Sequence, residues 1–183
     1  MSWTWPTGLP WRWSRRGLPC LSGAIALALL TGCTGYPRLL NFPYSSSDRG
    51  LNSRRADLTP YLSGNLIIFA SNRNGSQDIY LFDADRRQLI DLPGLNSLDA
   101  TAAEPTLSED GRYIAYTASR YGVADIYLYD RETGMNRNLT EKLQAEVRSP
   151  SISADGDRIA FAANREGRWD VLVYDRRGRP LLP

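Results

Sequence analysis

Residues 105–130 read PTLSEDGRYIAYTASRYGVADIYLYD, and the same pattern of turn, apolar and charged residues returns in residues 150–175 as PSISADGDRIAFAANREGRWDVLVYD. Residues 60–83, PYLSGNLIIFASNRNGSQDIYLFD, hold a third copy that is two residues shorter at its first turn. The prolines that open the copies lie 45 residues apart. A fixed period of this length is typical of a tandem repeat whose units pack on their neighbours.

Each unit alternates short runs of β-branched and aromatic residues with turn residues. Ile114–Thr117 and Ile126–Tyr129 are such runs, and they predict strands. The dipeptide Asp110-Gly111 predicts a turn, because glycine tolerates positive φ and aspartate bonds its own backbone. A further run and the Pro-x-x-Ser segment bring the unit to four strands in about 45 residues, the size of a propeller blade. We therefore expect an all-β fold of three tandem four-stranded antiparallel blades, a partial or half propeller, at about residues 57–102, 103–147 and 148–183.

Both faces of the predicted sheets are apolar, although alternate side chains of a strand point to opposite faces. This pattern predicts blades stacked face to face. Three blades do not close a ring, since propellers have about four to eight blades, so one apolar face stays bare on the first blade and one on the third. The residues expected there are Leu66, Ile68 or Ile79 and Val171 or Leu172. We expect a homodimer that completes a six-bladed propeller, or an obligate complex with another propeller fragment, to cover these faces.

The motif Arg-x-Gly-x-x-Asp occurs once in every unit, with an aromatic residue four positions before the arginine. Its charged members are Arg73 and Asp78, Arg120 and Asp125, and Arg165 and Asp170. A charged binding site is one interpretation of these residues. Because a residue repeated in every unit serves the unit first, we favour structural ion pairs or turn hydrogen bonds.

The first 32 residues have the organisation of an export signal. Three arginines precede the apolar stretch 18–31, which rises only about 21 Å as a helix, less than the roughly 30 Å of a bilayer core. The residues before and at Cys33, Leu-Thr-Gly-Cys, resemble the lipobox of bacterial lipoproteins. This resemblance implies cleavage before Cys33 and diacylation of its thiol; an uncleaved anchor or an ordinary signal peptide is the alternative. Arg15 and Arg16 resemble a twin-arginine signal, so Sec and twin-arginine export both stay open.

The chain is accordingly divided into a signal peptide over residues 1–32, a lipidated N-terminus and flexible tether over 33–56, and propeller repeats over 57–183. The tether is rich in Ser, Arg, Pro and Gly. Its residues 38–42 have the character of a short strand that could join the outer edge of the third blade, or of a partner's.

Composition excludes several kinds of site. The chain has no histidine, and its two cysteines, Cys20 and Cys33, fall in the predicted signal and at the predicted lipid site. The body therefore holds no His- or Cys-based catalytic or metal centre, and we expect no enzyme activity, metal or cofactor. Beyond residue 32, 19 basic residues face 20 acidic ones, which gives no electrostatic footprint for nucleic acid.

Three further groups of residues have two interpretations each. Asp155–Asp157 invites a calcium site, but the rest of a calcium loop is missing, so a β-turn is favoured. Glu104 and Glu146 invite glycoside chemistry, yet ordinary surface carboxylates explain them better. Trp169, the one tryptophan beyond the signal, is either a contact residue or part of rim packing, and both interpretations stay open.

The repeats resemble the propeller repeat of the TolB family. The resemblance rests on Pro-x-x-Ser-x-Asp-Gly-x-x-Ile-Ala-Phe/Tyr followed by Arg-x-Gly-x-x-Asp-Ile-Tyr, and it covers roughly residues 57–183. It implies the blade fold and a habit of binding other proteins. Similar blades accompany peptidases of the prolyl-oligopeptidase and tricorn type, but nothing here resembles their Gly-x-Ser-x-Gly elbow. The separate α/β domain and six blades of TolB are not matched, so membership of a Tol–Pal complex is not implied.

Together these features predict a lipid-anchored protein of the cell envelope of a Gram-negative-type bacterium, facing the periplasm and binding other envelope proteins. Its membrane attachment is the Cys33 lipid. Thr34, in place of aspartate, favours the outer membrane by analogy with enteric sorting. The alternative is a propeller that binds a small ligand, carbohydrate or peptide, or a noncatalytic accessory to an envelope enzyme.

Overall fold

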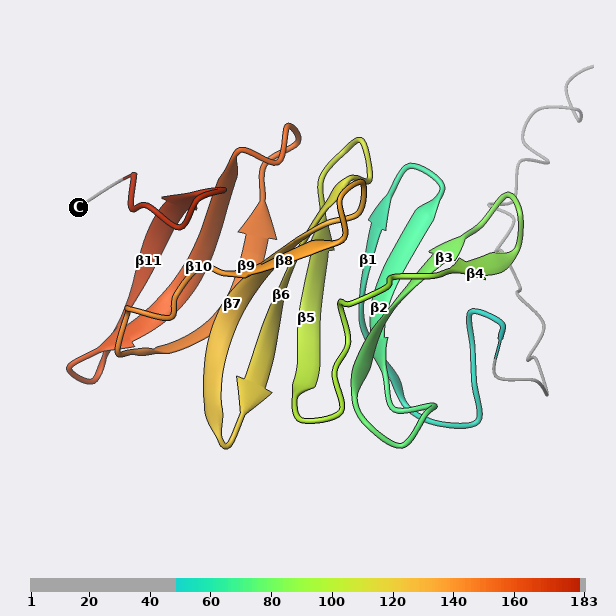
Figure 1. Cartoon of the computed structure of the whole chain (residues 1–183), viewed down its shortest axis with the longest axis horizontal. Helices are drawn as coiled ribbons and strands as arrows, with labels where there is room; N and C mark the ends of the chain where they lie inside the picture. The colour runs from blue at the N-terminus through green and yellow to red at the C-terminus, as the bar shows by residue number, and fades with distance from the viewer. Residues whose placement is uncertain (1–48, 182–183) are drawn as a thin grey trace, which may run out of the picture. The chain divides into compact units, whose positions relative to one another are not determined.

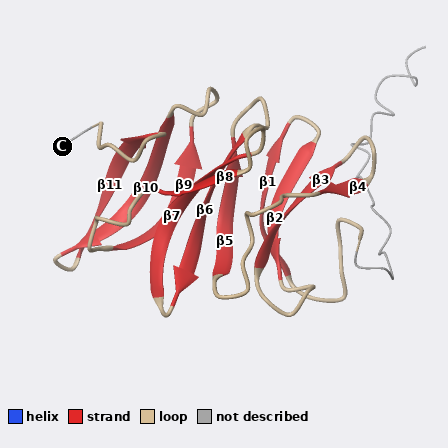
Figure 2. Cartoon of the chain, viewed as in Figure 1, coloured by secondary structure: helices blue, strands red, loops and turns tan. Residues whose placement is uncertain are grey.

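The computed structural model describes residues 49–181, which belong to the compact unit Phe42–Pro183. The predicted signal peptide, Cys33 and the strand expected at 38–42 lie outside these residues. Every regular element in the described part of the chain is a β-strand (Figure 2), and none of its segments is a helix able to cross a membrane.

Eleven strands form three antiparallel sheets along residues 49–181 (Figure 1). The first sheet has the order β1 (Asp57–Ser63), β2 (Leu66–Ser71), β3 (Asp78–Asp83) and β4 (Gln88–Ile90). The second has the order β5 (Thr101–Leu107), β6 (Tyr113–Arg120), β7 (Val123–Asp130) and β8 (Met135–Asn138). The third has the order β9 (Glu146–Ile152), β10 (Arg158–Arg165) and β11 (Arg168–Asp175). The all-β blade fold expected from the repeats is confirmed.

Within the described residues, which end at Leu181, the third sheet has a single bridge where the other two sheets have a fourth strand. Tyr174 pairs with Pro180, and the Leu181 N–H donates to the Val173 carbonyl at 2.8 Å. At the equivalent place in the second sheet, Tyr129 pairs with Asn136 inside β8.

Two hydrophobic cores lie between successive sheets. The core between the first and second sheets includes Ile68, Ile79 and Leu81 on one side and Ile114, Tyr116 and Tyr129 on the other. The core between the second and third includes Ala115, Ile126 and Leu128 facing Phe161, Leu172 and Tyr174. In both, aliphatic and small side chains of one sheet meet aromatic side chains of the next. The stacking predicted from two-faced apolar strands is therefore present.

The expectation of bare outer faces holds for one residue and fails for others. Val171 is 75% exposed on the outer face of the third sheet, but Leu172 is 6% exposed in the core facing the second sheet. Ile68 and Ile79 are buried against the second sheet at 0% and 1% exposure, and Leu66 packs partly buried against the same core. They lie there because the first sheet turns these strand positions toward β5 and β6. Its outer face instead carries Phe69, which is 2% exposed.

The Asp-Gly turns serve packing as well as chain reversal. Gly111 and Gly156 both have φ of 72°, the left-handed region that glycine adopts without strain. A Cβ at Gly111 would lie 2.5 Å from Leu66 Cδ1, and one at Gly156 would collide with the Tyr113 ring. Each turn thus needs glycine to approach the preceding sheet closely.

Candidate functional site

The first strands of the three sheets carry the same distortion at the same repeat position. Thr59, Glu104 and Ser149 each precede a proline and have φ of 45°, 49° and 53°. Each strand, β1, β5 and β9, also shifts register against its partner at this point. A β-bulge of this kind re-aims side chains and is common next to functional sites.

The three bulges line one shallow hollow of about 270 Å³. We call its lining, residues 59–61, 104–106 and 149–151, the inner strip. Non-glycine residues at positive φ cost roughly 1–3 kcal/mol each, and such strain is concentrated where structure serves function. Three repetitions of it along adjacent strands make the inner strip the leading candidate for a contact surface.

Glu104 links two blades across the inner strip. Its Oε2 accepts hydrogen bonds from Thr117 Oγ1 at 3.1 Å and from the Ser149 N–H at 2.7 Å. The carboxylate therefore fixes the second bulge against the third. Glu146 is exposed and does not line the hollow, and no second carboxylate is among the residues that do. The arrangement offers no acid pair for glycoside chemistry.

The exposed part of the inner strip is polar with one aromatic side chain. Tyr61 is 40% exposed, and Thr59, Ser149 and Ser151 are also exposed. Pro105 and Thr106 are buried beneath the surface. A rigid backbone that presents tyrosine and hydroxyl side chains is suited to protein contact, because little side-chain entropy is lost on binding.

The first copy of the Arg-x-Gly-x-x-Asp motif does not form an internal ion pair in the described residues. Arg73 has a side chain 1% exposed and donates to Asp57 Oδ1 at 2.8 Å and to the Gly50 carbonyl at 2.8 Å. Its guanidinium also lies over the Phe69 ring, 5.0 Å from the centroid. Burial alone would raise the pKa of Asp57, but hydrogen bonds from Ser71 and Arg73 outweigh it and lower that pKa.

Asp78, the other member of this copy, is 8% exposed and accepts from Ser76 Oγ at 3.0 Å. Burial raises the pKa of Asp78, because a charged carboxylate is penalised away from water.

The charged residues of the second and third copies have other partners than those of the first. Asp125 accepts from Thr140 Oγ1 at 2.8 Å and from Asn138 Nδ2 at 3.0 Å, while Arg120 reaches Asp99 at 3.5 Å. In the third copy, Arg165 does pair with Asp170 at 3.3 Å. Asp170 also accepts from Arg168 at 3.0 Å, and that hydrogen bond is the main cause of its lowered pKa.

These contacts are local to each blade and its flanking segments. No motif residue lines the inner strip. The structural interpretation of the motif stays a prediction, and the substitutions in the Discussion test it.

The remaining residues singled out from the sequence lie apart from the inner strip. Asp155 accepts from the Asp157 N–H at 3.0 Å within its turn, and Asp157 pairs with Arg176. Across residues 49–181 there is no group of three or more metal-ligating side chains. Trp169 is 36% exposed and lies 3.8 Å from the Arg148 guanidinium, a cation–π contact on the outer face of the third sheet.

Sequence reasoning missed the inner strip. The recurring prolines were visible, but the residue before a proline ordinarily adopts extended backbone rather than positive φ. The one available signal was the position itself, because each bulge residue directly precedes a proline of the 45-residue period.

The geometry defines a protein of stacked propeller blades with a shallow hollow on their first strands. The TolB beta propeller domain family matches residues 53–181, and the chain belongs to that family. No curated protein matches the chain.

Solved structures with the same blade arrangement include TolB from Acinetobacter baumannii, with 26% identity and a TM-score of 0.55 over 69% of this chain and 31% of that one. A putative TolB from Agrobacterium tumefaciens has 22% identity and a TM-score of 0.54 over 67% of this chain and 48% of that one. The propeller domain of the Trilobed protease from Pyrococcus furiosus has 17% identity and a TM-score of 0.53 over 70% and 42%. The chain thus spans from 31% to 48% of the length of these relatives. The last two likenesses concern the fold alone.

Proposed function

We propose that this protein is a lipid-anchored component of the cell envelope whose propeller repeats act as a protein–protein interaction module. The family match carries the interaction role, because propeller repeats of the TolB type generally serve that purpose. The inner strip is the surface proposed to make the contact. Its strained, proline-fixed backbone supports this role, since a preorganised surface loses little entropy on binding.

A small-ligand role is the second candidate for the same surface. Pockets for small molecules commonly enclose about 300–1,000 Å³, whereas the hollow of the inner strip is shallow and measures about 270 Å³. This size favours contact with a protein over enclosure of a carbohydrate or a short peptide.

Capture from envelope extract on the immobilised protein separates the two candidates. Tyr61→Ala is expected to lose the captured protein, and Tyr121→Ala, which removes a more exposed tyrosine from a hairpin outside the strip, is expected to keep it. A thermal shift with sugars or peptides, combined with no Tyr61-dependent capture, would favour the small-ligand role instead.

The anchor is proposed at Cys33, with the outer membrane as its site. The lipobox-like residues before Cys33 and Thr34 after it support this placement. Labelling cells with an alkyne fatty acid tests the attachment, because the Cys33→Ala protein should lose the label. Equal labelling of both proteins would reject the lipid anchor.

A second copy of the chain is the proposed partner for the outer face of the third sheet. That face presents Ala160, Ala162 and Val171. Ala160 and Val171 occupy the repeat positions of Ala115 and Ile126, which in the second sheet meet aromatic side chains of the third. The outer face of the first sheet offers the matching aromatic set, Phe69, Tyr80 and Phe82.

Head-to-tail pairing of two copies would give six blades. Phe69 and Phe82 are each 2% exposed, so this pairing requires the first face to open. Size-exclusion chromatography with light scattering should show a dimer at micromolar concentration, and a stable monomer without partner would reject it.

A further inference from the structure

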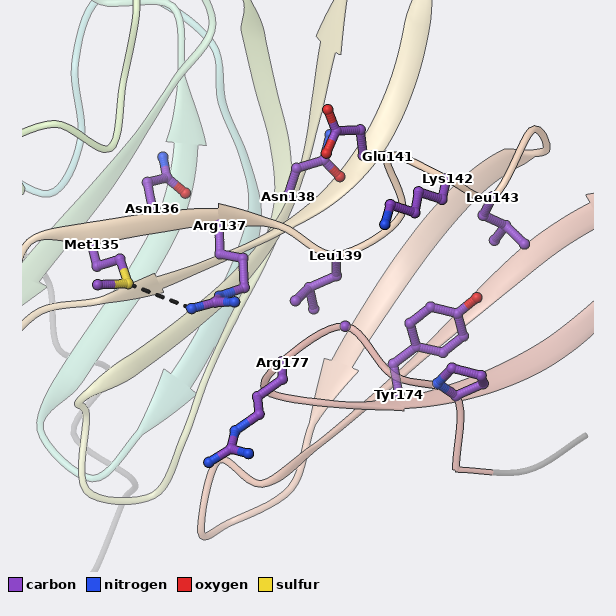
Figure 3. A pocket seen from close by; sticks show the side chains of 12 residues that line it. Met135, Asn136, Arg137, Asn138, Leu139, Glu141, Lys142, Leu143, Tyr174 and Arg177 are labelled. Carbon is purple, nitrogen blue, oxygen red and sulfur yellow. Dashed lines mark hydrogen bonds between the residues drawn. The ribbon is translucent and has the colours of Figure 1, made fainter.

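A second hollow lies between the second and third sheets, and its lining comes from the last strand of the second sheet and the end of the third rather than from the first strands. It measures about 700 Å³ and is lined by β8, by residues 139 and 141–143, and by Tyr174 and the turn after β11 (Figure 3). We call it the outer groove. Its lining shares no residue with the inner strip.

The outer groove exists because one connection is shorter than its counterpart. Ten residues join β4 to β5, but seven join β8 to β9. Between the first two sheets, the longer connection covers Tyr129, whose hydroxyl donates to the Pro93 carbonyl at 2.8 Å. Between the second and third sheets, the equivalent Tyr174 lines the groove instead.

The groove collects positive charge that the protein does not neutralise. Arg137 from β8, Lys142 from the connection and Arg177 from the turn all line it, against one acid, Glu141. None of the three cations forms an ion pair within residues 49–181, where eight other arginines do. Cations that converge on a hollow with low-dielectric walls focus a positive potential and attract an anion.

The groove also has an apolar floor and an open strand edge. Leu139, Leu143 and Tyr174 lie among its lining residues, and Met135 is 55% exposed at its rim. β8 is the edge strand of the second sheet, paired only with β7 in the described structure. A strand edge offers alternating main-chain donors and acceptors, and an extended peptide can pair with both, whereas a phosphate has no backbone to match them.

We propose that the outer groove is a docking site for an extended acidic peptide segment of a protein partner. The carboxylates of the segment bind Arg137, Lys142 and Arg177, its apolar side chains lie on the floor, and its backbone pairs with β8. The inference rests on the proposed function in one respect, that the partner is a protein, and it adds a site separate from the inner strip.

Fluorescence anisotropy on the full chain, in mild non-ionic detergent, tests the site. The probe is a fluorescein-labelled octapeptide, Glu-Thr-Glu-Leu-Glu-Thr-Glu-Thr, and a version with lysine in place of every glutamate is its control. The triple variant Arg137→Gln, Lys142→Gln, Arg177→Gln should raise the Kd at least tenfold. The matched variant Arg54→Gln, Arg55→Gln, Arg87→Gln removes three exposed arginines outside the groove and should change the Kd less than twofold.

Binding of the acidic probe should also weaken as salt rises from 50 to 200 mM, and the lysine probe should not bind. Equal losses in the two triple variants, or no binding of the acidic probe, would overturn the proposal. So would binding of inorganic pyrophosphate through the same three cations without binding of the peptide, because that result assigns the groove to a phosphate ligand. Capture through Tyr61 is a separate readout: its loss with retained peptide binding rejects the inner strip and leaves the groove intact.

Discussion

Replacing Asp125 by alanine tests whether the repeated motif holds the blades together. Asp125 accepts two side-chain hydrogen bonds, from Thr140 and Asn138, and Thr140 Oγ1 in turn accepts from the Ile126 N–H at 2.9 Å. Thr140 is 3% exposed, so alanine at position 125 leaves a buried hydroxyl without its acceptor. Hydrogen bonds to a charged group contribute about 1.5–3 kcal/mol each when buried. Because Asp125 is only half-buried, we expect a loss of about 2 kcal/mol in the free energy of unfolding.

A loss of this size corresponds to a fall of about 4–8 °C in Tm, measured by calorimetry on the full chain. Asp125→Asn keeps one carbonyl acceptor and should lose about half as much. The matched control is Asp170→Ala, at the same repeat position, where the partners Arg165 and Arg168 have side chains 47% and 80% exposed. Its Tm should stay at the wild-type value. An unchanged Tm in Asp125→Ala would refute the structural interpretation of the motif, and an equal fall in both variants would refute the expectation that exposed partners make Asp170 dispensable.

Two further substitutions probe the electrostatics and the packing. Asp57→Asn should destabilise the protein at pH 7 by about 2–3 kcal/mol, because it removes a carboxylate partner of the buried Arg73. The pKa of Asp57 is lowered in the folded state. Urea unfolding should therefore show the stability difference between wild type and Asp57→Asn shrinking as the pH falls below about 4 and through the folded-state pKa. Gly156→Ala should unfold at a lower urea concentration than Gly64→Ala, because both glycines have positive φ but only a Cβ at 156 meets the Tyr113 ring; equal midpoints would contradict the close turn-to-sheet contact.

The blade fold was predictable because its signals are local and repeated. Ile126–Tyr129 and its copies combine high β propensity with two apolar faces, and those features indicate strands that are buried between sheets. The Asp-Gly turn before β6 was likewise predicted from two adjacent residues, and Gly111 has the positive φ that such a turn requires.

The partners of the motif charges were not predictable, because they depend on contacts between segments distant in sequence. Arg73 pairs with Asp57, 16 residues away, rather than with Asp78 within its own motif. The inner strip was missed for a different reason. Local stereochemistry before a proline favours extended backbone, and the packed strands around Glu104 and Ser149 overrule that preference.

Photo-crosslinking from the inner strip in living cells tests the central claim most directly. p-Benzoylphenylalanine at position 61 replaces a tyrosine of the strip, and at position 121 it replaces a tyrosine that is 96% exposed outside it. Binding through the inner strip predicts a crosslinked envelope protein from position 61 and none from position 121. The absence of a crosslink from position 61, or the same crosslinked bands from both positions, would contradict an interaction module that binds through the inner strip.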